Sequence, residues 1–322
     1  MKQLLPRNSF GCPYLLLAPM EGVGDRSFRK AMASIGGFDE ACAEFLRVPM
    51  HAHIPSLSEQ YVAGETDPIP LAAQVMGSDP ELMAEMARAL AEKGAPRIDL
   101  NCGCPSNTVT GKGAGSSLLK DPNLLYEIAK AMVDAVDVPV TAKLRSGFTD
   151  TSLFKENILA AQESGIAFLT LHPRTKEEGY GPPARWDLIA KAKSLLKIPV
   201  VGNGDIASVE GAHQVLKETK CDALMIGRGA LMNPWIFQEI KASFSKEPFE
   251  RPKNGLEIYL RTFAADLTEE MPIRNRIGKL KQLMGFYFKG SDVLLAKRSE
   301  MLKRDYASTQ EFVEQTLVAL NY

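Results

Sequence analysis

Short apolar segments recur along the first 230 residues, and each is bounded by Gly, Pro or Asp. Runs this short are typical of strands buried on both faces. Helical patterns separate several of them, and Pro80 and Pro122 each follow an Asp, which is the N-cap-then-Pro signal of a helix start. The predicted strands are residues 15–18, 41–45, 71–75, 98–101, 138–143, 168–172, 198–202 and 223–226, and the predicted helices between them include 80–93, 122–136, 151–164 and 186–196.

Eight strands that alternate with helices favour an α/β fold, a closed parallel (β/α)8 TIM barrel. The 322 residues can hold such a barrel of about 250 residues and leave a further part. From about Ser245 the pattern changes to a Pro- and Gly-containing linker followed by helices only, over 255–266, 273–288, 292–306 and 308–320. We therefore expect a catalytic barrel domain over residues 1–245 and an all-helical bundle domain over residues 246–322.

Composition narrows the class of protein. The apolar fraction of 45% and the charged fraction of 24% are ordinary for a soluble globular chain. The five cysteines (12, 42, 102, 104 and 221) are odd in number and widely spaced, which argues against a disulfide framework and fits a reducing cytosol. The early apolar run at 14–18 is far too short to span a bilayer. These features predict a cytoplasmic protein with no membrane association. The pair Cys102 and Cys104 lacks the further ligands of a closed zinc site, so we expect no metal.

The charged residues are unevenly distributed along the chain. Its net charge is −1, yet residues 271–304 carry nine Lys or Arg against Asp292 and Glu300. Phe286, Tyr287 and Phe288 lie within this basic segment. A solvated helical face explains many such runs. A basic appendage on a near-neutral barrel nevertheless suggests a polyphosphate partner.

Polar side chains gather at the predicted strand ends, which is where barrels place their chemistry. Asn101, Cys102 and Cys104 end the fourth strand, ahead of a loop rich in small residues at 110–117. Lys143 stands at the end of the fifth strand, where an anionic partner such as a reduced flavin ring would offset its burial. Gln74 ends the third strand and His172 the sixth, although a purely structural histidine is an equal alternative.

The loops after the seventh and eighth strands, at 202–206 and 226–229, are rich in glycine. In barrels these two loops commonly bind a phosphate through backbone N–H groups, and Arg228 could donate to its oxygens. The alternative is a pair of ordinary tight turns. The Gly111 region fails as a Walker A loop and is too weak a pattern for a Rossmann site.

Six ordered motifs resemble those of the tRNA-dihydrouridine synthases: Ala18-Pro-Met-Glu-Gly22, Asn101-Cys-Gly-Cys-Pro105, Lys143-Leu-Arg-Ser-Gly147, His172-Pro-Arg-Thr175, Asn203-Gly-Asp205 and Ile226-Gly-Arg-Gly229. The resemblance covers about residues 14–240, and the basic tail is of the family's kind. It implies an enzyme with FMN at the barrel mouth, NADPH as electron donor and a uridine of the tRNA D-loop as substrate. By position, the resemblance assigns FMN binding to Pro19, Met20, Glu21, Gln74, Lys143, His172, Asn203, Gly204, Asp205, Gly227 and Arg228.

The same resemblance assigns catalysis to Cys104, the cysteine directly before proline, which would protonate C5 of the uracil while hydride reaches C6. A thiol is a suitable neutral acid for that carbon. Asn101, Arg145 and Tyr180 would face the uracil. Cys102 and residues 44–48 are most similar to the subclass that modifies position 16, and in that subclass the residues matching Arg47, Lys279, Lys281 and Arg298 would orient the tRNA. Pro173 departs from the family pattern and removes a backbone N–H beside His172.

Two other functions fit parts of the pattern. One is an FMN-dependent reductase of a free pyrimidine, which has no use for a basic helical appendage. The other is a non-catalytic RNA-binding barrel, against which the joint presence of Cys104, Lys143 and Arg228 argues. We expect a monomer that binds tRNA.

Overall fold

The computed structural model describes residues 5–106, 113–181 and 183–321. The strands in these ranges are β1 (Tyr14–Leu17), β2 (Glu40–Cys42), β3 (Leu46–Arg47), β4 (Leu71–Met76), β5 (Ile98–Cys102), β6 (Val140–Gly147), β7 (Leu169–Thr175), β8 (Val200–Asn203) and β9 (Ala223–Ile226). All of their pairings are parallel. The order β2-β1-β9-β8-β7-β6-β5-β4 is closed by pairing of β2 with β4, and β3 pairs with β4 further along the same edge.

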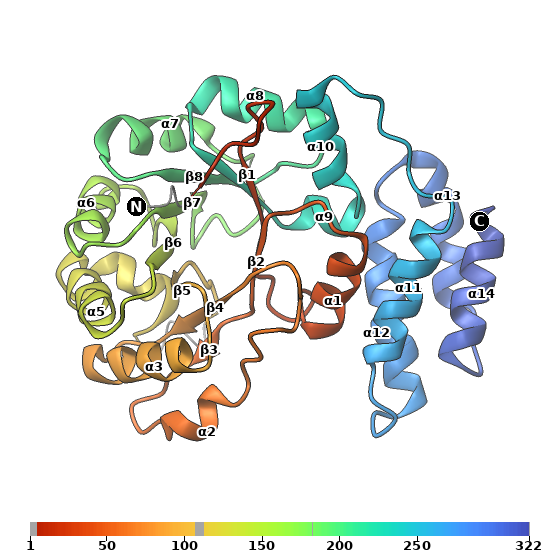
Figure 1. Ribbon diagram of the computed structural model, residues 1–322, viewed down its shortest axis with the longest axis horizontal. Helices are drawn as coiled ribbons and strands as arrows, with labels where there is room; N and C mark the ends of the chain where they lie inside the picture. Colours follow the sequence, from red (N-terminus) through yellow and green to blue (C-terminus); the bar gives the residue numbers. More distant parts are fainter. Residues whose placement is uncertain (1–4, 107–112, 182, 322) are drawn as a thin grey trace.

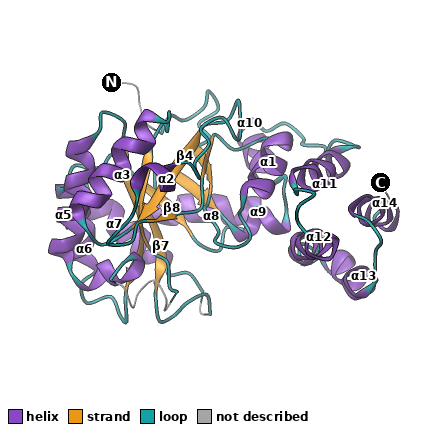
Figure 2. Cartoon of the chain, turned by 90° about the horizontal axis from the view of Figure 1, so that it is seen from below, coloured by secondary structure: helices purple, strands orange, loops and turns teal. Residues whose placement is uncertain are grey.

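The closed sheet is surrounded by helices, and the predicted TIM barrel is confirmed (Figure 1). Figure 2 shows the strands inside a ring of helices, with a separate group of helices beside it. The helices of the barrel part are α1 (Arg26–Ile35), α2 (Ile54–Ser58), α3 (Pro80–Glu92), α5 (Pro122–Ala135), α6 (Phe154–Glu163), α7 (Trp186–Leu195), α8 (Val209–Thr219), α9 (Arg228–Met232) and α10 (Ile236–Ser245), with a 3-10 helix at Gly115–Lys120. Asp79 and Asp121 cap α3 and α5 through their carboxylates, as the Asp-Pro pairs predict.

Alternation along the strands decides what lies inside the barrel. Ile98, Leu100 and Cys102 of β5 pack into the main hydrophobic core under the helices. Successive strand residues point to opposite faces, so Asp99 and Asn101 point inward. The same rule applies to the neighbouring strands and brings one layer of polar side chains to the carboxyl end of the barrel: Gln74, Asn101, Lys143, His172 and Asn203.

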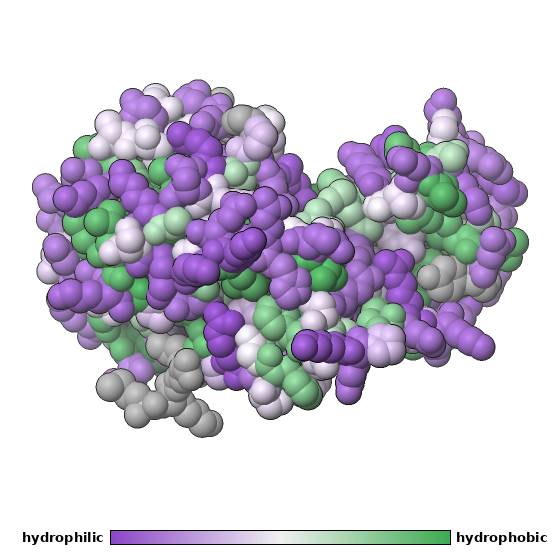
Figure 3. Space-filling model, turned by 90° about the horizontal axis from the view of Figure 1, so that it is seen from above, coloured by the Kyte–Doolittle hydropathy of each residue, from purple (hydrophilic) through white to green (hydrophobic). Residues whose placement is uncertain are grey.

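The remaining helices, α11 (Gly255–Asp266), α12 (Ile273–Tyr287), α13 (Asp292–Lys303) and α14 (Thr309–Ala319), form the expected helical bundle beside the barrel. The molecule has two lobes with an indentation between them (Figure 3). The α10 helix ends at Ser245 and α11 begins at Gly255, which leaves the division at residue 245 as a prediction.

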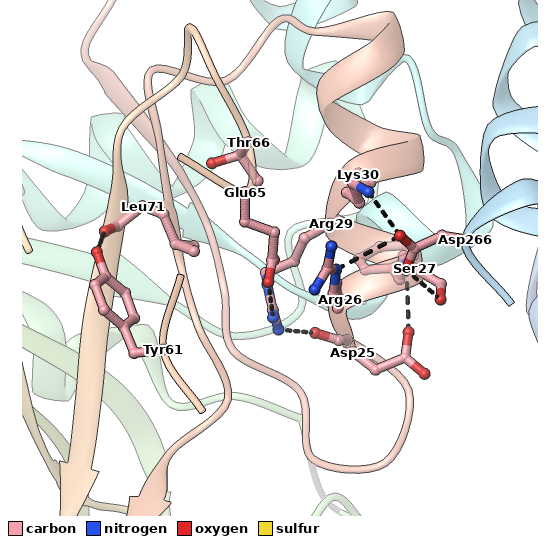
Figure 4. A network of polar contacts seen from close by, with 12 residues as sticks. Asp25, Arg26, Ser27, Arg29, Lys30, Tyr61, Glu65, Thr66, Leu71 and Asp266 are labelled. Carbon is pink, nitrogen blue, oxygen red and sulfur yellow. Dashed lines mark hydrogen bonds and ion pairs between the residues drawn. The ribbon is translucent and has the colours of Figure 1, made fainter. Parts of the chain in front are cut away.

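The two lobes are joined by a polar network between α1 and α11 (Figure 4). Asp266 accepts hydrogen bonds from Lys30 Nζ at 2.6 Å and Ser27 Oγ at 3.0 Å, and it faces Arg26. Asp25, which caps α1, also pairs with Lys279 of α12. These contacts between α1 of the barrel and α11 and α12 of the helical lobe hold the two lobes together.

Candidate active site

One cavity of about 670 Å³ opens at the carboxyl end of the barrel strands. A volume of this size fits a cofactor or a drug-sized ligand. Every predicted barrel residue except Arg47 lines it. These are Pro19, Met20, Glu21, Gln74, Asn101, Cys104, Lys143, Arg145, His172, Tyr180, Asn203, Gly204, Asp205, Gly227 and Arg228.

Cys104 follows β5 and is held by its backbone on both sides. Its N–H donates to Asn101 Oδ1 at 2.9 Å, and its carbonyl accepts from Ser116 Oγ at 2.8 Å. Burial raises the pKa of the thiol above its ordinary value, and the charges of Arg145 and Arg47 oppose this only in part. The Cys104 side chain is therefore a neutral thiol at pH 7, able to donate a proton into the cavity.

Lys143 of β6 is a partly buried ammonium group at the cavity floor. Among the described residues no hydrogen-bond or ion-pair partner of its Nζ is found. Burial and the charge of Arg145 lower its pKa to about 8. An amine in this state gains free energy from an anionic or acceptor group placed beside it.

His172 of β7 is kept neutral. Burial, assisted by the charges of Lys143 and Arg145, lowers its pKa to about 2. Arg174 Nη1 lies 3.2 Å from His172 Nε2, and because an arginine can only donate, the histidine proton is on Nδ1. His172 can thus donate or accept at this wall, but it does not carry a positive charge.

Asp205 and Arg228 line the end of the cavity next to His172, since Arg174 contacts both His172 and Asp205. Asp205 has a left-handed backbone with φ 56°, and its carboxylate accepts from Arg174, from the Ala184 N–H at 2.8 Å and from Arg228 at 3.1 Å. Burial alone would raise the pKa of Asp205, but these donors outweigh it and lower the pKa. Arg228 is held by Asp205 while its side chain stays about half exposed, at the start of α9.

Tyr180 covers the mouth of the cavity. It is 57% exposed, and the centroid of its ring lies 5.1 Å from the guanidinium of Arg145 and 4.7 Å from that of Arg228. Arg145 in turn donates to the carbonyls of Gly103, Thr175 and Gly179, each at 2.8 Å. An aromatic face supported by two cations is a surface on which a planar ligand can stack.

The structure does not bring the four predicted tRNA-orienting residues into the cavity. Arg47 lies on β3 and contributes its charge to the surroundings of Cys104. Lys279 pairs with Asp25, Lys281 donates to the Arg304 carbonyl, and Arg298 donates to the Gly285 carbonyl. Part of the small-residue loop at 110–117, namely 110–112, lies outside the described residues.

Sequence reasoning missed several residues of the site. Phe286 and Lys289 of the helical lobe line the cavity, although sequence indicated them only as part of a basic segment. Glu44, which sequence indicated only as part of the segment 44–48, also lines it and accepts from the Gly22 N–H at 2.6 Å. Ser116, which holds the Cys104 carbonyl, was hidden within the small-residue loop. Such roles depend on contacts across the fold, for which a single sequence carries no local signal.

Two classes of feature are not found in the part of the chain that the structure describes. No group of three or more His, Cys, Asp or Glu side chains is arranged to hold a metal ion. No helix there has the length and apolar character needed to cross a membrane.

Comparison with known proteins shows one family. The family model described as dihydrouridine synthase matches residues 16–315. A tRNA-dihydrouridine(16) synthase of Pseudomonas syringae is 38% identical over 278 residues, which is 83% of this chain and 87% of the relative. One from Neisseria meningitidis serogroup B is 33% identical over 94% of this chain and 89% of its own. A tRNA-dihydrouridine synthase B of Vibrio parahaemolyticus is 45% identical over 70% of both chains.

Solved structures share the fold at low sequence identity. A 2-naphthoyl-CoA reductase superposes with a TM-score of 0.54 at 13% identity and covers 73% of this chain. A histamine dehydrogenase of a Rhizobium species gives a TM-score of 0.56 at 15% identity over 79% of this chain. The chain spans about half the length of these two proteins.

Proposed function

The chain belongs to the dihydrouridine synthase family of flavin-dependent oxidoreductases, and we propose that it uses FMN and NADPH to reduce the C5=C6 bond of a tRNA D-loop uridine to 5,6-dihydrouridine. The observation that carries this proposal is the neutral Cys104 thiol, which shares one cavity with the Lys143 ammonium and the Asp205–Arg228 end. We also propose that the protein acts as a monomer in the cytoplasm.

The cavity suits a flavin by its size and its lining. Lys143 offers an ammonium without a partner among the described residues, which would bind the electron-rich edge of the ring. A Cβ on Gly227 would lie 3.3 Å from Met20 Sδ and 3.4 Å from Ala18 Cβ, so glycine avoids crowding Met20 at the cavity wall. Arg228 and the backbone around Gly204 would hold the phosphate.

The residues of the chain prepare the uridine for reduction. A bound flavin would supply the hydride for uracil C6. Cys104 would give its thiol proton to C5, which burial allows because the thiol stays protonated at neutral pH. Asn101 would donate to a uracil carbonyl, and Tyr180 would cover the base after it leaves its stacked context. The apolar side chains of Met20 and Phe286 would exclude water from the reacting atoms.

Position 16 of the tRNA is the proposed site of modification. Two of the relatives described above bear that position in their names and match most of the chain, whereas the relative named synthase B is more identical over a shorter part. The Cys102–Cys104 spacing and residues 44–48 support the same subclass. The proposal places the tRNA across the indentation between the lobes (Figure 3). In support, Phe286 and Lys289 of the helical lobe line the cavity together with barrel residues.

A spectroscopic titration of the full chain tests the function. The purified protein is loaded with FMN, reduced anaerobically with NADPH, and then mixed with unmodified tRNA. We expect the flavin absorbance to bleach with NADPH and to recover with tRNA but not with free uridine, and mass spectrometry of the product to place a gain of two mass units at position 16.

Recovery with a free pyrimidine would instead support a small-molecule reductase. Absence of flavin bands after FMN addition would overturn the redox function and leave an RNA-binding barrel.

A further inference from the structure

We propose that Asp99 is a positioning residue, which sets the orientation of Cys104 through a directed chain of two side-chain amides, Gln74 and Asn101. Asp99 lies inside the barrel and is 0% exposed. Its role goes beyond the proposed function, although the proton transfer that it would serve rests on that function.

The chain has a fixed direction at its cysteine end. The N–H groups of Gly103 and Cys104 both donate to Asn101 Oδ1 at 2.9 Å. Backbone N–H groups can only donate, so the oxygen of the Asn101 amide must face them. Asn101 Nδ2 then points to Gln74 Oε1 at 2.8 Å, and Gln74 Nε2 is left to face Asp99.

The other end imposes the same direction independently. Asp99 accepts from Gln74 Nε2 at 2.7 Å, from Thr141 Oγ1 at 2.6 Å and from Arg97 Nη1 at 3.3 Å. Arg97 also donates to Thr141 Oγ1, so the hydroxyl proton of Thr141 points to Asp99. All three partners of Asp99 are donors, so both of its carboxyl oxygens act as acceptors at this end.

A carboxamide at position 99 therefore cannot satisfy the whole chain. If its oxygen stays with Arg97 and Thr141, its amino group meets the amino group of Gln74. Rotation of the Gln74 amide moves that conflict to Asn101, and rotation of Asn101 moves it to the N–H groups of Gly103 and Cys104. Since the Arg97 charge holds the oxygen at its own end, the mismatch falls between position 99 and Cys104 and disturbs the hydrogen bonds that hold Cys104.

The orientation of the Gln74 and Asn101 amides also determines whether a ligand in the cavity contacts donor or acceptor groups. Gln74 and Asn101 both line the cavity, and each NH2 group uses one hydrogen within the chain. The second hydrogen of each remains for the ligand, so this wall presents donors that match carbonyl groups. Reversal of either amide would present an acceptor oxygen in their place.

Four variants of the full chain test the proposal. Asp99→Asn disrupts the donor-to-acceptor order of the hydrogen-bond chain without a change in side-chain size. Thr141→Val removes one of the three donors to Asp99 and should have a smaller effect. The double variant Asp99→Asn/Gln74→Glu restores it, since a carboxylate at position 74 would accept both from the carboxamide at position 99 and from Asn101. Thr170→Val is the matched control, because the Thr170 hydroxyl is buried in β7 and has no hydrogen-bond partner among the residues that the structure describes.

The main measurement is the rate at which iodoacetamide alkylates Cys104, followed by peptide mass spectrometry against pH. Cys104 is 8% exposed, whereas the other four cysteines are at most 1% exposed and report on folding if they stay unmodified. We expect at least a threefold faster alkylation in Asp99→Asn, a smaller increase in Thr141→Val, and a return to within twofold of the parent rate in the double variant. Thr170→Val should match the parent.

Equal alkylation rates and pH profiles in the parent and Asp99→Asn would overturn the proposal, as would a failure of the double variant to restore the rate. This readout needs neither flavin nor tRNA, so failure of the proposed function leaves it valid. With tRNA as substrate, the proposal further expects kcat of Asp99→Asn to fall at least tenfold while KM changes less than twofold.

Discussion

At the scale of single residues, the two neighbouring cysteines offer the sharpest contrast in the site. Cys104 lines the cavity, whereas Cys102 points outward into the hydrophobic core. We expect Cys104→Ala to lower the single-turnover rate of dihydrouridine formation by a factor of about 10²–10⁴, the usual worth of a positioned acid. Cys102→Ala should keep that rate and lose about 1 kcal/mol of unfolding free energy in urea. Equal losses of rate in the two variants would contradict the assignment.

Lys143 predicts how cofactor affinity depends on pH. Its pKa is lowered to about 8, so the folded free protein loses the Lys143 proton around pH 8, whereas the unfolded chain keeps it until near the ordinary value of 10.5. An electron-rich ligand favours the charged form, so FMN affinity should weaken as the pH rises above 8. Lys143 also makes the free energy of unfolding of the free protein depend on pH. This free energy should increase as the pH rises from about 8 to 10.5, because the folded protein then no longer buries the Lys143 charge.

A fluorescence titration of FMN at several pH values measures the Lys143 effect. Lys143→Met should bind FMN at least tenfold more weakly at pH 7 and lose the dependence above pH 8. An unchanged slope in that variant would assign the dependence to another group.

At the scale of elements, sequence patterns predicted the parts that have strong local signals. All eight barrel strands were located, and the helix Gly255–Asp266 has the predicted bounds. The pattern missed β3, α2 and α9, since elements of two to five residues carry no measurable periodicity. The helix predicted from residue 151 begins at Phe154, because residues 151–153 form a bend and a turn ahead of it.

Gly204 tests how strongly a loop after a strand depends on its backbone. It has φ +115°, and an added Cβ would lie 2.9 Å from His172 Cδ2. Gly204→Ala should cost about 1–3 kcal/mol of unfolding free energy and weaken FMN binding. The control is Gly211→Ala within α8, where the added Cβ meets only Ser208 Oγ at 3.5 Å. That change should stabilise by up to about 1 kcal/mol in urea unfolding. Similar costs at the two positions would refute the backbone argument.

At the scale of the whole molecule, contacts between the lobes limit what sequence could predict. Asp25 and Lys279 are 254 positions apart, and nothing near either residue indicates their ion pair. The strand ends could be assigned to one site because barrel geometry brings them together. No comparable rule predicts which residues the helical tail brings together. The sequence analysis therefore assigned Lys279, Lys281 and Arg298 to tRNA binding and did not predict their hydrogen-bond and ion-pair partners within the chain. The lobes also share packing between α1 and α11, so removal of the tail would uncover barrel surface as well as remove charge.

Single charge removals therefore test tRNA binding by the helical lobe better than truncation does. Lys281 donates to the Arg304 carbonyl and lies 5.4 Å from the Tyr306 ring, so Lys281→Met keeps the length of the side chain and removes its charge. If Lys281 contacts a phosphate, the plot of log affinity for tRNA against log salt concentration should lose about one unit of slope. Lys217→Met on the exposed side of α8 is the control and should leave the slope unchanged. A slope that stays constant in Lys281→Met would place the tRNA elsewhere, and an enzyme acting on a free pyrimidine would show no effect of either variant on its substrate affinity.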